Sequence, residues 1–512
     1  KDGGDEQKQP YELSTNVDKL ALGETLLSLS SKLRVGQKVL IAVAWCREDE
    51  RELFELFPEV LMFDVTFGTN TESRPLGVSA SIDSNMNVFT PFRVFMPSQC
   101  QWVFDWIIGT ALPSLLGKEA LKRVQLFMSD GDAKIYNAFD KYQSTLMPIA
   151  LHQLCVYHLV NKGLETMRQL VGKDRPDVIN QQMTFKHSIF SWMGIGGVEN
   201  EDEFTHSLRR LNSWLHAQQQ SSVPELASNA HVYDLFLTKT ILHHKKRWFF
   251  PHRKHLLTLG QKTTSALEGV NQTIKYKSSK VVTPNMTILE SLKTQDIQSQ
   301  TRMDKYRKTT VNNYGSRPLW TNSGSAVDLT KICESQIQQQ YQQNNNYICR
   351  VVSNLQINVV RSPLVLPFCY DCTEMVVCGK CSENSPCVRF KRRRSITFAY
   401  NAVTNRYVVR CSCPYYTTYG IPCRHVCKFL LVTKQNVNVR WWKEFAALYH
   451  RKGYEKSKAE FQTRMYDQTL TISCEEYRQI FERARHDERE NGSINVSSVS
   501  YTHLTLPTND LV

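Results

Sequence analysis

The fold of this chain is decided by residues 60–70, VLMFDVTFGTN, where a run of apolar side chains ends at an acid. Apolar residues followed directly by Asp64 are typical of a buried strand that presents a carboxylate at a sheet edge. Residues 124–139, VQLFMSDGDAKIYNAF, repeat this pattern, with Asp130 after the apolar run. Both acids are therefore predicted to lie at strand ends.

A third acid, Glu268, lies in residues 263–275, TTSALEGVNQTIK, which have helical character and in which Asn271 and Lys275 follow it. Carboxylates from two strand ends and a helix suit a two-metal phosphoryl-transfer site. Their oxygens bind Mg²⁺ or Mn²⁺, and two ions roughly 4 Å apart stabilise the attacking and leaving oxygens. A single acid at a strand end is usually a turn or helix-cap residue, so the interpretation depends on all three acids together.

The predicted elements around the first two acids follow one another as three strands, a helix, a strand, a helix and a strand. This is the order of an α/β, ribonuclease-H-like core. In that core the first and fourth strands are neighbours, so Asp64 and Asp130 would lie together. The predicted strands are 38–45, 60–67, 76–82, 88–96, 124–128 and 147–152, and the predicted helices are 18–34, 47–57, 102–116, 133–142 and 156–170.

A long, largely helical stretch at 163–262 separates this core from Glu268. Leu208, Leu211 and Leu215, for example, recur there at near-helical spacing. Two interpretations stay open, a second helical domain and an insertion into the core. The insertion gains support because the chain then returns to a helix that could supply the third acid.

Other acids compete for two of the three positions. Asp132 is a near neighbour of Asp130 and an alternative for the second acid. Glu199, Glu201 and Glu203 are alternatives for the third, although such an acidic run is more often a solvated helix start. We therefore place these residues behind the three acids named above.

Four separated motifs, in this order, resemble the Mutator-like (MULE) transposase domain. They contain Asp64, Asp130, the pair Cys155 and His158, and Glu268. The resemblance implies a DDE-type nuclease, with a ribonuclease-H-like core and an all-helical insertion before the final Glu. It also implies that the three acids are a catalytic triad that binds Mg²⁺ or Mn²⁺, and that the pair is the Cys-x-x-His motif of the family. The alternative for the pair is a buried Cys and a helix-surface His.

A second motif lies in residues 410–431, RCSCPYYTTYGIPCRHVCKFLL. It contains Cys411-x-Cys413, nine residues, and then Cys423-x-His425. Three thiolates and one imidazole satisfy the tetrahedral Zn²⁺ of a closed structural site. With a predicted hairpin before it and a helix after it, the segment resembles the SWIM zinc finger, which accompanies Mutator-like transposases. The hairpin is predicted at 395–400 and 406–410, and the helix at 426–432.

A cysteine cluster precedes that finger. Two Cys-x-x-Cys pairs, Cys369 with Cys372 and Cys378 with Cys381, suit a small zinc knuckle. Cys387 is a fifth cysteine, so the ligand set is ambiguous, and we favour the two pairs. A cysteine-rich loop without metal is the alternative.

Composition constrains the partners and the compartment. The net charge of +14 in 512 residues favours a polyanion, and we expect DNA. Nine of the fifteen cysteines lie between Cys369 and Cys427 at metal-ligand spacings, which favours a reducing, intracellular compartment. No stretch is apolar enough to predict a membrane span. We expect the nucleus as the location and a homo-oligomer as the active form.

Three further stretches have a biased composition. Residues 389–395, RFKRRRS, suit a nuclear-localisation signal or a phosphate-contacting patch. Residues 243–255, HHKKRWFFPHRKH, interleave cations with aromatics, as nucleic-acid surfaces do, or form a solvated face with packed aromatics. The glutamine-rich residues 335–347 predict a helix end or linker at a domain boundary.

These observations predict the organisation of the whole chain. The N-terminal segment is expected to be truncated, because the chain begins without Met, and residues 500–512 resemble translated adapter sequence. The expected segments are a helical flank at 1–35, the first part of the core at 36–162, the helical insertion at 163–262, the final core helix at 263–300, a helical, glutamine-rich linker at 301–360, the cysteine-rich knuckle at 361–394, the SWIM finger at 395–435, a helical region at 436–490 and a disordered tail at 491–512.

The leading interpretation of function is cut-and-paste DNA transposition, with Mg²⁺ or Mn²⁺ for catalysis and Zn²⁺ for structure. The main rival is a domesticated DNA-binding transcription factor, because far-red-response factors resemble the same transposases and keep the SWIM finger. An intact acidic trio favours the enzyme, since a factor that only binds DNA has no chemical need for it. A SWIM-containing ubiquitin-ligase component is a third interpretation, but the sequence lacks a RING motif and this interpretation leaves the acids unexplained.

Overall fold

The computed structural model describes residues 40–156, 158–159, 170–190, 194–261, 263–277, 281–313, 329–345, 347–361, 394–430, 437 and 470–491. The chain divides into two compact units, and the division falls between Ser335 and Gln336, in the glutamine-rich tract where a boundary was expected. Unit 1 also takes in Pro414–Ile421. Among the described residues, no helix is both long and apolar enough to cross a membrane.

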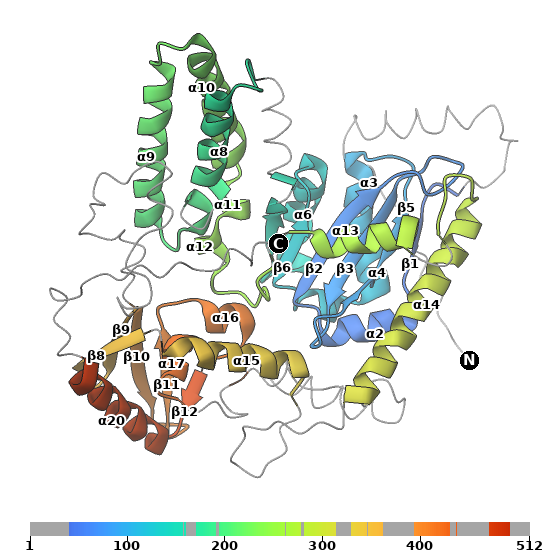
Figure 1. The fold of residues 1–512 in the computed structure, drawn as a ribbon. Helices are drawn as coiled ribbons and strands as arrows, with labels where there is room; N and C mark the ends of the chain where they lie inside the picture. The colour runs from blue at the N-terminus through green and yellow to red at the C-terminus, as the bar shows by residue number, and fades with distance from the viewer. Residues whose placement is uncertain are drawn as a thin grey trace, which may run out of the picture. The chain divides into compact units, whose positions relative to one another are not determined.

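Unit 1 is built on a mixed sheet of seven strands (Figure 1). The strands are β1 (Val43–Trp45), β2 (Val60–Thr66), β3 (Leu76–Ile82), β4 (Val88–Phe89), β5 (Arg93–Phe95), β6 (Leu126–Ser129) and β7 (Leu151–Leu154). Their order is β1-β5-β3-β2-β6-β7, and β4 pairs with β3. β2, β6 and β7 are parallel to one another, whereas β3 is antiparallel to β2 and to β5.

The centre of this sheet is the part of the chain that the apolar runs predicted. The first four residues of β2, Val60–Phe63, are buried, and β3 is buried along its whole length. A strand covered on both faces needs a continuous apolar run in place of an alternating one. β2 lies directly beside β6, so the expected adjacency of the strands that lead to Asp64 and Asp130 is confirmed.

Two predicted strands differ from the structure at their ends. The single strand expected at 88–96 is split into β4 and β5, because Pro91 lies between them and has no N–H for the ladder. The strand expected at 147–152 begins later, at Leu151, because a turn follows α6 (Ala133–Leu146), which is itself longer than predicted. Pro148 follows the end of α6, a common position for proline after a helix.

Helices cover the sheet of unit 1. They are α2 (Glu48–Leu56), α3 (Gln101–Trp106), η1 (Ile107–Ala111), α4 (Leu112–Leu116), α5 (Lys118–Leu121), α6, α13 (Ser265–Gln272), η4 (Thr273–Lys277) and α14 (Ile288–Asn313). The helix predicted at 102–116 is one continuous rod with a π-helical turn, η1, just before Pro113. α13 packs against β2 and β3 and crosses them in Figure 1.

The described residues between β7 and α13 are largely helical. Their helices are α8 (Pro176–Phe190), η2 (Ile195–Gly197), α9 (Glu201–Gln219), α10 (Pro224–Phe236), η3 (Leu237–Leu242), α11 (Lys245–Trp248) and α12 (Phe250–Arg253). α8, α9 and α10 pack against one another (Figure 1) around an aromatic cluster in which Phe185 stacks on Tyr233 with 4.4 Å between ring centroids.

Unit 2 contains an antiparallel sheet in the order β12-β11-β10-β9-β8. α20 (Cys474–Asn491) packs against β8 and β11. The predicted hairpin is confirmed as β10 and β11, whereas the helix expected at 426–432 begins earlier, as α17 (Arg424–Cys427). The strands are β8 (Tyr347–Ser353), β9 (Gln356–Arg361), β10 (Arg394–Asn401), β11 (Arg406–Cys411) and β12 (Leu470–Ile472).

Part of the expected helical linker is instead this sheet. α14 and α15 (Lys331–Asn344) are helical, but residues 347–361 form β8 and β9. Ile357 and Val359 alternate along β9 and are fully buried, so a period of two with β-branched side chains was the signal for a strand. β12 is likewise a strand within the region expected to be helical at 436–490.

Candidate functional site

The pairing register of β2 and β6 brings Asp64 and Asp130 to one level of the sheet. Met62 pairs with Met128, and each acid lies two residues further along its strand direction. Because the two strands are parallel, their carboxyl ends meet at the same edge. Asp64 is the fifth residue of β2, and Asp130 directly follows β6.

α13 brings Glu268 to the same place. The helix packs on β2 and β3, and Asn271, one turn after Glu268, donates from Nδ2 to Asp64 Oδ2 at 3.1 Å. The backbone N–H of Glu268 donates to the carbonyl of Thr264, the residue that precedes α13, at 3.0 Å. The structure therefore brings all three predicted acids together, although Glu268 follows Asp64 by about 200 residues of sequence.

The pKa of Asp64 reflects both its burial and the charged groups near it. Burial, together with the negative charges of Asp130 and Glu268, raises the pKa of Asp64 to about 6, although the charge of His158 lowers it. Lys275, on the continuation of α13, is also an electrostatic neighbour of Asp64. Like charges held together in a partly buried place are a common feature of functional sites.

Two oxygens at this place lack hydrogen-bond donors. Glu268 Oε1 and Asn271 Oδ1 are buried and have no hydrogen-bond partner among the described residues. An oxygen of this kind fits a hard cation such as Mg²⁺, which binds carboxylate and amide oxygens. The carboxylates do not converge into a compact ligand shell. Within the described part of the chain, only a Cys/His group has three or more ligand atoms placed to hold a metal ion.

Cys155 links the end of β7 to the start of α13. Its Sγ accepts hydrogen bonds from the backbone N–H of Thr264 at 3.2 Å and from the Thr264 hydroxyl at 3.1 Å. Its own N–H donates to the carbonyl of Ser129 at 2.8 Å. Cys155 therefore joins the strand that precedes Asp130 to the residue that begins the helix of Glu268. The sequence contained no signal for Thr264.

His158 lies between Cys155 and the acids. A hydrogen bond with Cys155, together with the charges of Cys155, Asp64 and Asp130, raises the pKa of His158 to about 9, against the effect of burial. Burial raises the pKa of Cys155, but hydrogen bonds from His158 and Thr264 outweigh it and lower the pKa overall. The thiol is buried and His158 is half-buried.

The acids that are alternatives for the second and third positions lie at the starts of helices. Asp132 is the N-cap of α6 and accepts from the N–H of Lys134 at 2.9 Å, while its own N–H donates to Asp130 Oδ1 at 3.1 Å. The run at 199–203 is the start of α9, where Asn200 accepts from the N–H of Glu203. Acids in a first helical turn interact favourably with the helix dipole.

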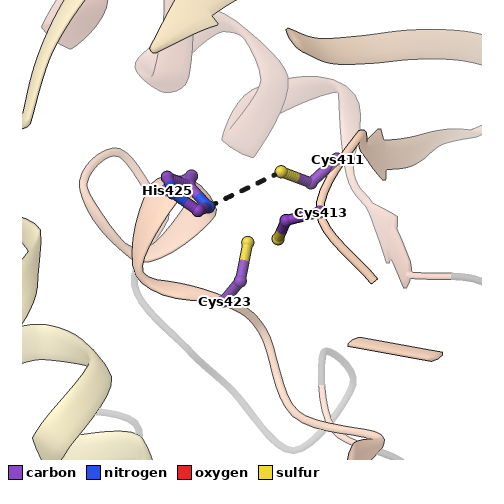
Figure 2. A group of neighbouring side chains, drawn as sticks. All are labelled: Cys411, Cys413, Cys423 and His425. Carbon is purple, nitrogen blue, oxygen red and sulfur yellow. Dashed lines mark hydrogen bonds between the residues drawn. The ribbon is translucent and has the colours of Figure 1, made fainter. Parts of the chain in front are cut away.

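The predicted zinc ligands converge in unit 2 (Figure 2). The ligand atoms of Cys411, Cys413, Cys423 and His425 all lie within 4.8 Å of one another. Cys411 ends β11, Cys413 follows it, and Cys423 and His425 begin α17. Burial raises the pKa of Cys423, but hydrogen bonds from the neighbouring thiols and from backbone amides outweigh it, so the thiolate form is favoured. Three sulfurs and one imidazole at this spacing fit a structural Zn²⁺.

Two other predicted features have different outcomes. The cluster of Cys369, Cys372, Cys378 and Cys381 lies outside the described residues.

In the basic tract at 243–255, Trp248 and Phe249 are packed in the aromatic cluster of the helical stretch, and Lys245 stacks on Phe204 and pairs with Glu201. Buried rings cannot stack on bases, so Trp248 and Phe249 fit the alternative of packed aromatics.

Comparison with known families identifies two parts of the chain. Residues 60–162 match the MULE transposase domain, and residues 407–432 match the SWIM zinc finger. The chain therefore contains both modules, as its motifs indicated. It is also similar to the PKS-NRPS hybrid synthetase cheA of Chaetomium globosum, with 19% identity over 241 residues, which are 47% of this chain and 5% of that protein. The chain thus spans a small fraction of that relative's length.

Proposed function

We propose that this protein, which is related to the Mutator-like transposases, is a DDE-type DNA transposase. It would hydrolyse a phosphodiester at a transposon end and transfer the freed 3′-hydroxyl to target DNA. The observation that supports the proposal most is that Asp64, Asp130 and Glu268 lie on adjoining elements, two parallel strands and the helix packed on them, with Glu268 Oε1 buried and without a hydrogen-bond partner among the described residues.

The proposal includes a ribonuclease-H-like core. Such a core needs three antiparallel strands beside two parallel ones, with the first strand in the middle. The order β5-β3-β2-β6-β7, with β2 parallel to β6 and antiparallel to β3, supports it. The helical stretch between β7 and α13 would then be the insertion, because α13 returns to β2 and β3.

Within this site the three acids would hold Mg²⁺ or Mn²⁺. When bound, the ions would supply charge stabilisation for the attacking and leaving oxygens of a phosphodiester. Asn271 orients Asp64 through its hydrogen bond to Oδ2, so one oxygen of that carboxylate keeps a fixed direction. His158 places positive charge near Asp64, which favours the ionised form of that carboxyl.

The partner we propose is DNA, at transposon ends and at the target, with a homo-oligomer as the active form and the nucleus as the location. The net charge of +14 supports a polyanionic partner. Zn²⁺ in the Cys/His group would stabilise unit 2 and take no part in the reaction, because all four positions of a tetrahedral ion are occupied by protein ligands.

The test is nicking of DNA that carries the terminal sequences of the element. Wild type should nick this DNA in the presence of Mn²⁺, whereas Asp64→Asn and Glu268→Gln should leave it intact, because each loses a metal ligand. Asp132→Asn is the matched control, since asparagine caps a helix as well as aspartate does and activity should be kept. Equal nicking by wild type and Asp64→Asn would refute the assignment of the triad.

The same assay addresses a domesticated DNA-binding factor. A wild-type protein that binds the terminal DNA but fails to nick it, with intact Zn²⁺ content, would contradict the enzyme and favour the factor. The flanking genome gives an independent result. Terminal inverted repeats with target duplications indicate a mobile element, and a single-copy syntenic locus without them indicates domestication.

A further inference from the structure

We propose that Arg247 is a positioning residue for Asp130, acting from the helical stretch through His152 and Ser129. The inference rests on the proposed function, because it concerns an acid assigned there to metal binding. It gives the helical stretch a role beyond returning the chain to α13. Arg247 lies in α11, which packs on β7, and a chain of hydrogen bonds runs from its guanidinium to the backbone of Asp130.

Each link of this chain has an ordinary hydrogen-bond length. Arg247 Nη1 is 3.0 Å from His152 Nδ1. His152 Nε2 is 2.8 Å from Ser129 Oγ, and Ser129 Oγ donates to the carbonyl of Asp130 at 3.0 Å. The links join α11, β7 and the end of β6, so three segments that are distant in sequence fix one peptide group beside the acids.

The direction of every link follows from the first donor. A guanidinium has only donors, so Nδ1 of His152 must accept from Arg247. The ring is then neutral and carries its proton on Nε2, from which it donates to Ser129. The hydroxyl proton of Ser129 is left to donate to the carbonyl of Asp130. One arrangement of protons therefore satisfies the whole chain.

The environment holds these groups in place. Ser129 and His152 are buried. The imidazole packs against Phe127 and Phe139, with ring centroids 5.8 Å and 5.5 Å away. Rings on this side leave the imidazole little room to rotate, so its two hydrogen bonds are fixed by packing as well as by chemistry.

Arg247 is itself held by two neighbours on α6. Its guanidinium carbon lies 4.5 Å from the ring centroid of Tyr136, and it forms an ion pair with Asp140. α6 begins directly after Asp132, whose N–H donates to the carboxylate of Asp130. Arg247 therefore stabilises the backbone of Asp130. It also stabilises α6, whose N-cap residue Asp132 contacts the carboxylate of Asp130. Partners of this kind behind a metal ligand typically change metal affinity by about 10- to 100-fold when removed.

The adjacent residue of β7 provides a matched comparison. Gln153 is buried and accepts a hydrogen bond from Arg253, which lies in α12 of the same helical stretch. Successive residues of a strand point to opposite faces, so this second contact lies on the other side of the sheet from His152. Both pairs attach the helical stretch to β7, but only the pair of Arg247 and His152 leads to Asp130.

Mn²⁺ binding to the full chain, measured by electron paramagnetic resonance titration, tests the inference without using activity. Arg247→Met and His152→Phe should weaken Mn²⁺ binding by about 10-fold or more. Arg247→Lys should bind nearly as wild type, because it keeps a donor for Nδ1. Arg253→Met and Gln153→Leu lose a comparable contact and should bind as wild type. Weakening by all of these substitutions alike, or by none, would overturn the inference.

A second measurement does not depend on metal. In protein labelled with ¹⁵N only at histidine, His152 should show a neutral ring with its proton on Nε2, and Arg247→Met should change that signal. A proton on Nδ1 would overturn the hydrogen-bond chain even where the proposed function holds. Conversely, if wild type and Asp64→Asn bind Mn²⁺ equally, the metal site of the proposed function has failed and this inference falls with it, whatever the tautomer.

Discussion

Replacing Asp64 by asparagine should stabilise the metal-free protein while it removes activity. Burial and the charges of two neighbouring acids raise the pKa of Asp64 from 3.8 to about 6. Between these values the unfolded chain has released the proton and the folded chain keeps it, so the stability of wild type falls as the pH rises. Asparagine cannot ionise, and its amide oxygen can still accept from Asn271.

The size of the effect follows from the pKa shift. A shift of about 2 units corresponds to about 3 kcal/mol above pH 7, and to about half of that at pH 5, where the folded carboxyl is still protonated. These are upper values, because Asp64 is partly exposed to water. At roughly 2 °C per kcal/mol for a large domain, the unfolding temperature of unit 1 should rise by about 6 °C at most at pH 8.

Calorimetry of wild type and Asp64→Asn at pH 5 and pH 8, with chelator present, measures this difference. Asp132→Asn removes the same charge but keeps a cap for α6, so its unfolding temperature should match wild type at both pH values. Mn²⁺ at 100 times its dissociation constant should then stabilise wild type by about 2.7 kcal/mol and leave Asp64→Asn unchanged. The two proteins should therefore become nearly equal.

An Asp64→Asn protein that is less stable than wild type at pH 8 would refute this reasoning. It would mean that the carboxylate is stabilised in the folded chain by partners that outweigh burial and the other two acids. A stabilisation that is the same at pH 5 and pH 8 would also refute it, since the titration of Asp64 could not then be the cause.

Three further predictions concern other parts of the chain. Cys423→Ala should lower the Zn²⁺ content, measured by elemental analysis, by one ion per chain. The wild-type chain should contain two ions, and a content of one would contradict the zinc site predicted at Cys369, Cys372, Cys378 and Cys381. Arg93→Met should cost about 3–5 kcal/mol in urea unfolding because it leaves Glu50 buried without its ion pair, whereas adding Glu50→Leu should restore most of that stability. Thr264→Val removes a hydrogen bond to Cys155 and should cost about 1 kcal/mol, while Thr264→Ser should cost less; equal losses would contradict a role for the hydroxyl.

Local patterns were sufficient where the physics is local. A short, continuous apolar run bounded by polar residues is typical of a buried central strand, and such runs predicted β2 and its neighbour β6. The spacing of Cys411, Cys413, Cys423 and His425 predicted their convergence, because a short hairpin end and a short helix start can close a tetrahedral shell. Alternation in β9, where Ile357 and Val359 are buried, is also a local signal, although β9 lies close to a glutamine-rich tract.

Local sequence patterns were enough to predict the sheet centre, the convergence of the Cys/His group and the positions of two acids at strand ends. The tertiary structure alone decided where Glu268 lies, because a helical stretch separates it from the sheet and no local rule fixes the direction of the return. It also showed the hydrogen bonds of Cys155 with Thr264, 109 residues apart, and of His152 with Arg247, 95 residues apart. Such contacts depend on packing between distant segments, and no local sequence pattern identifies the two residues that packing brings together.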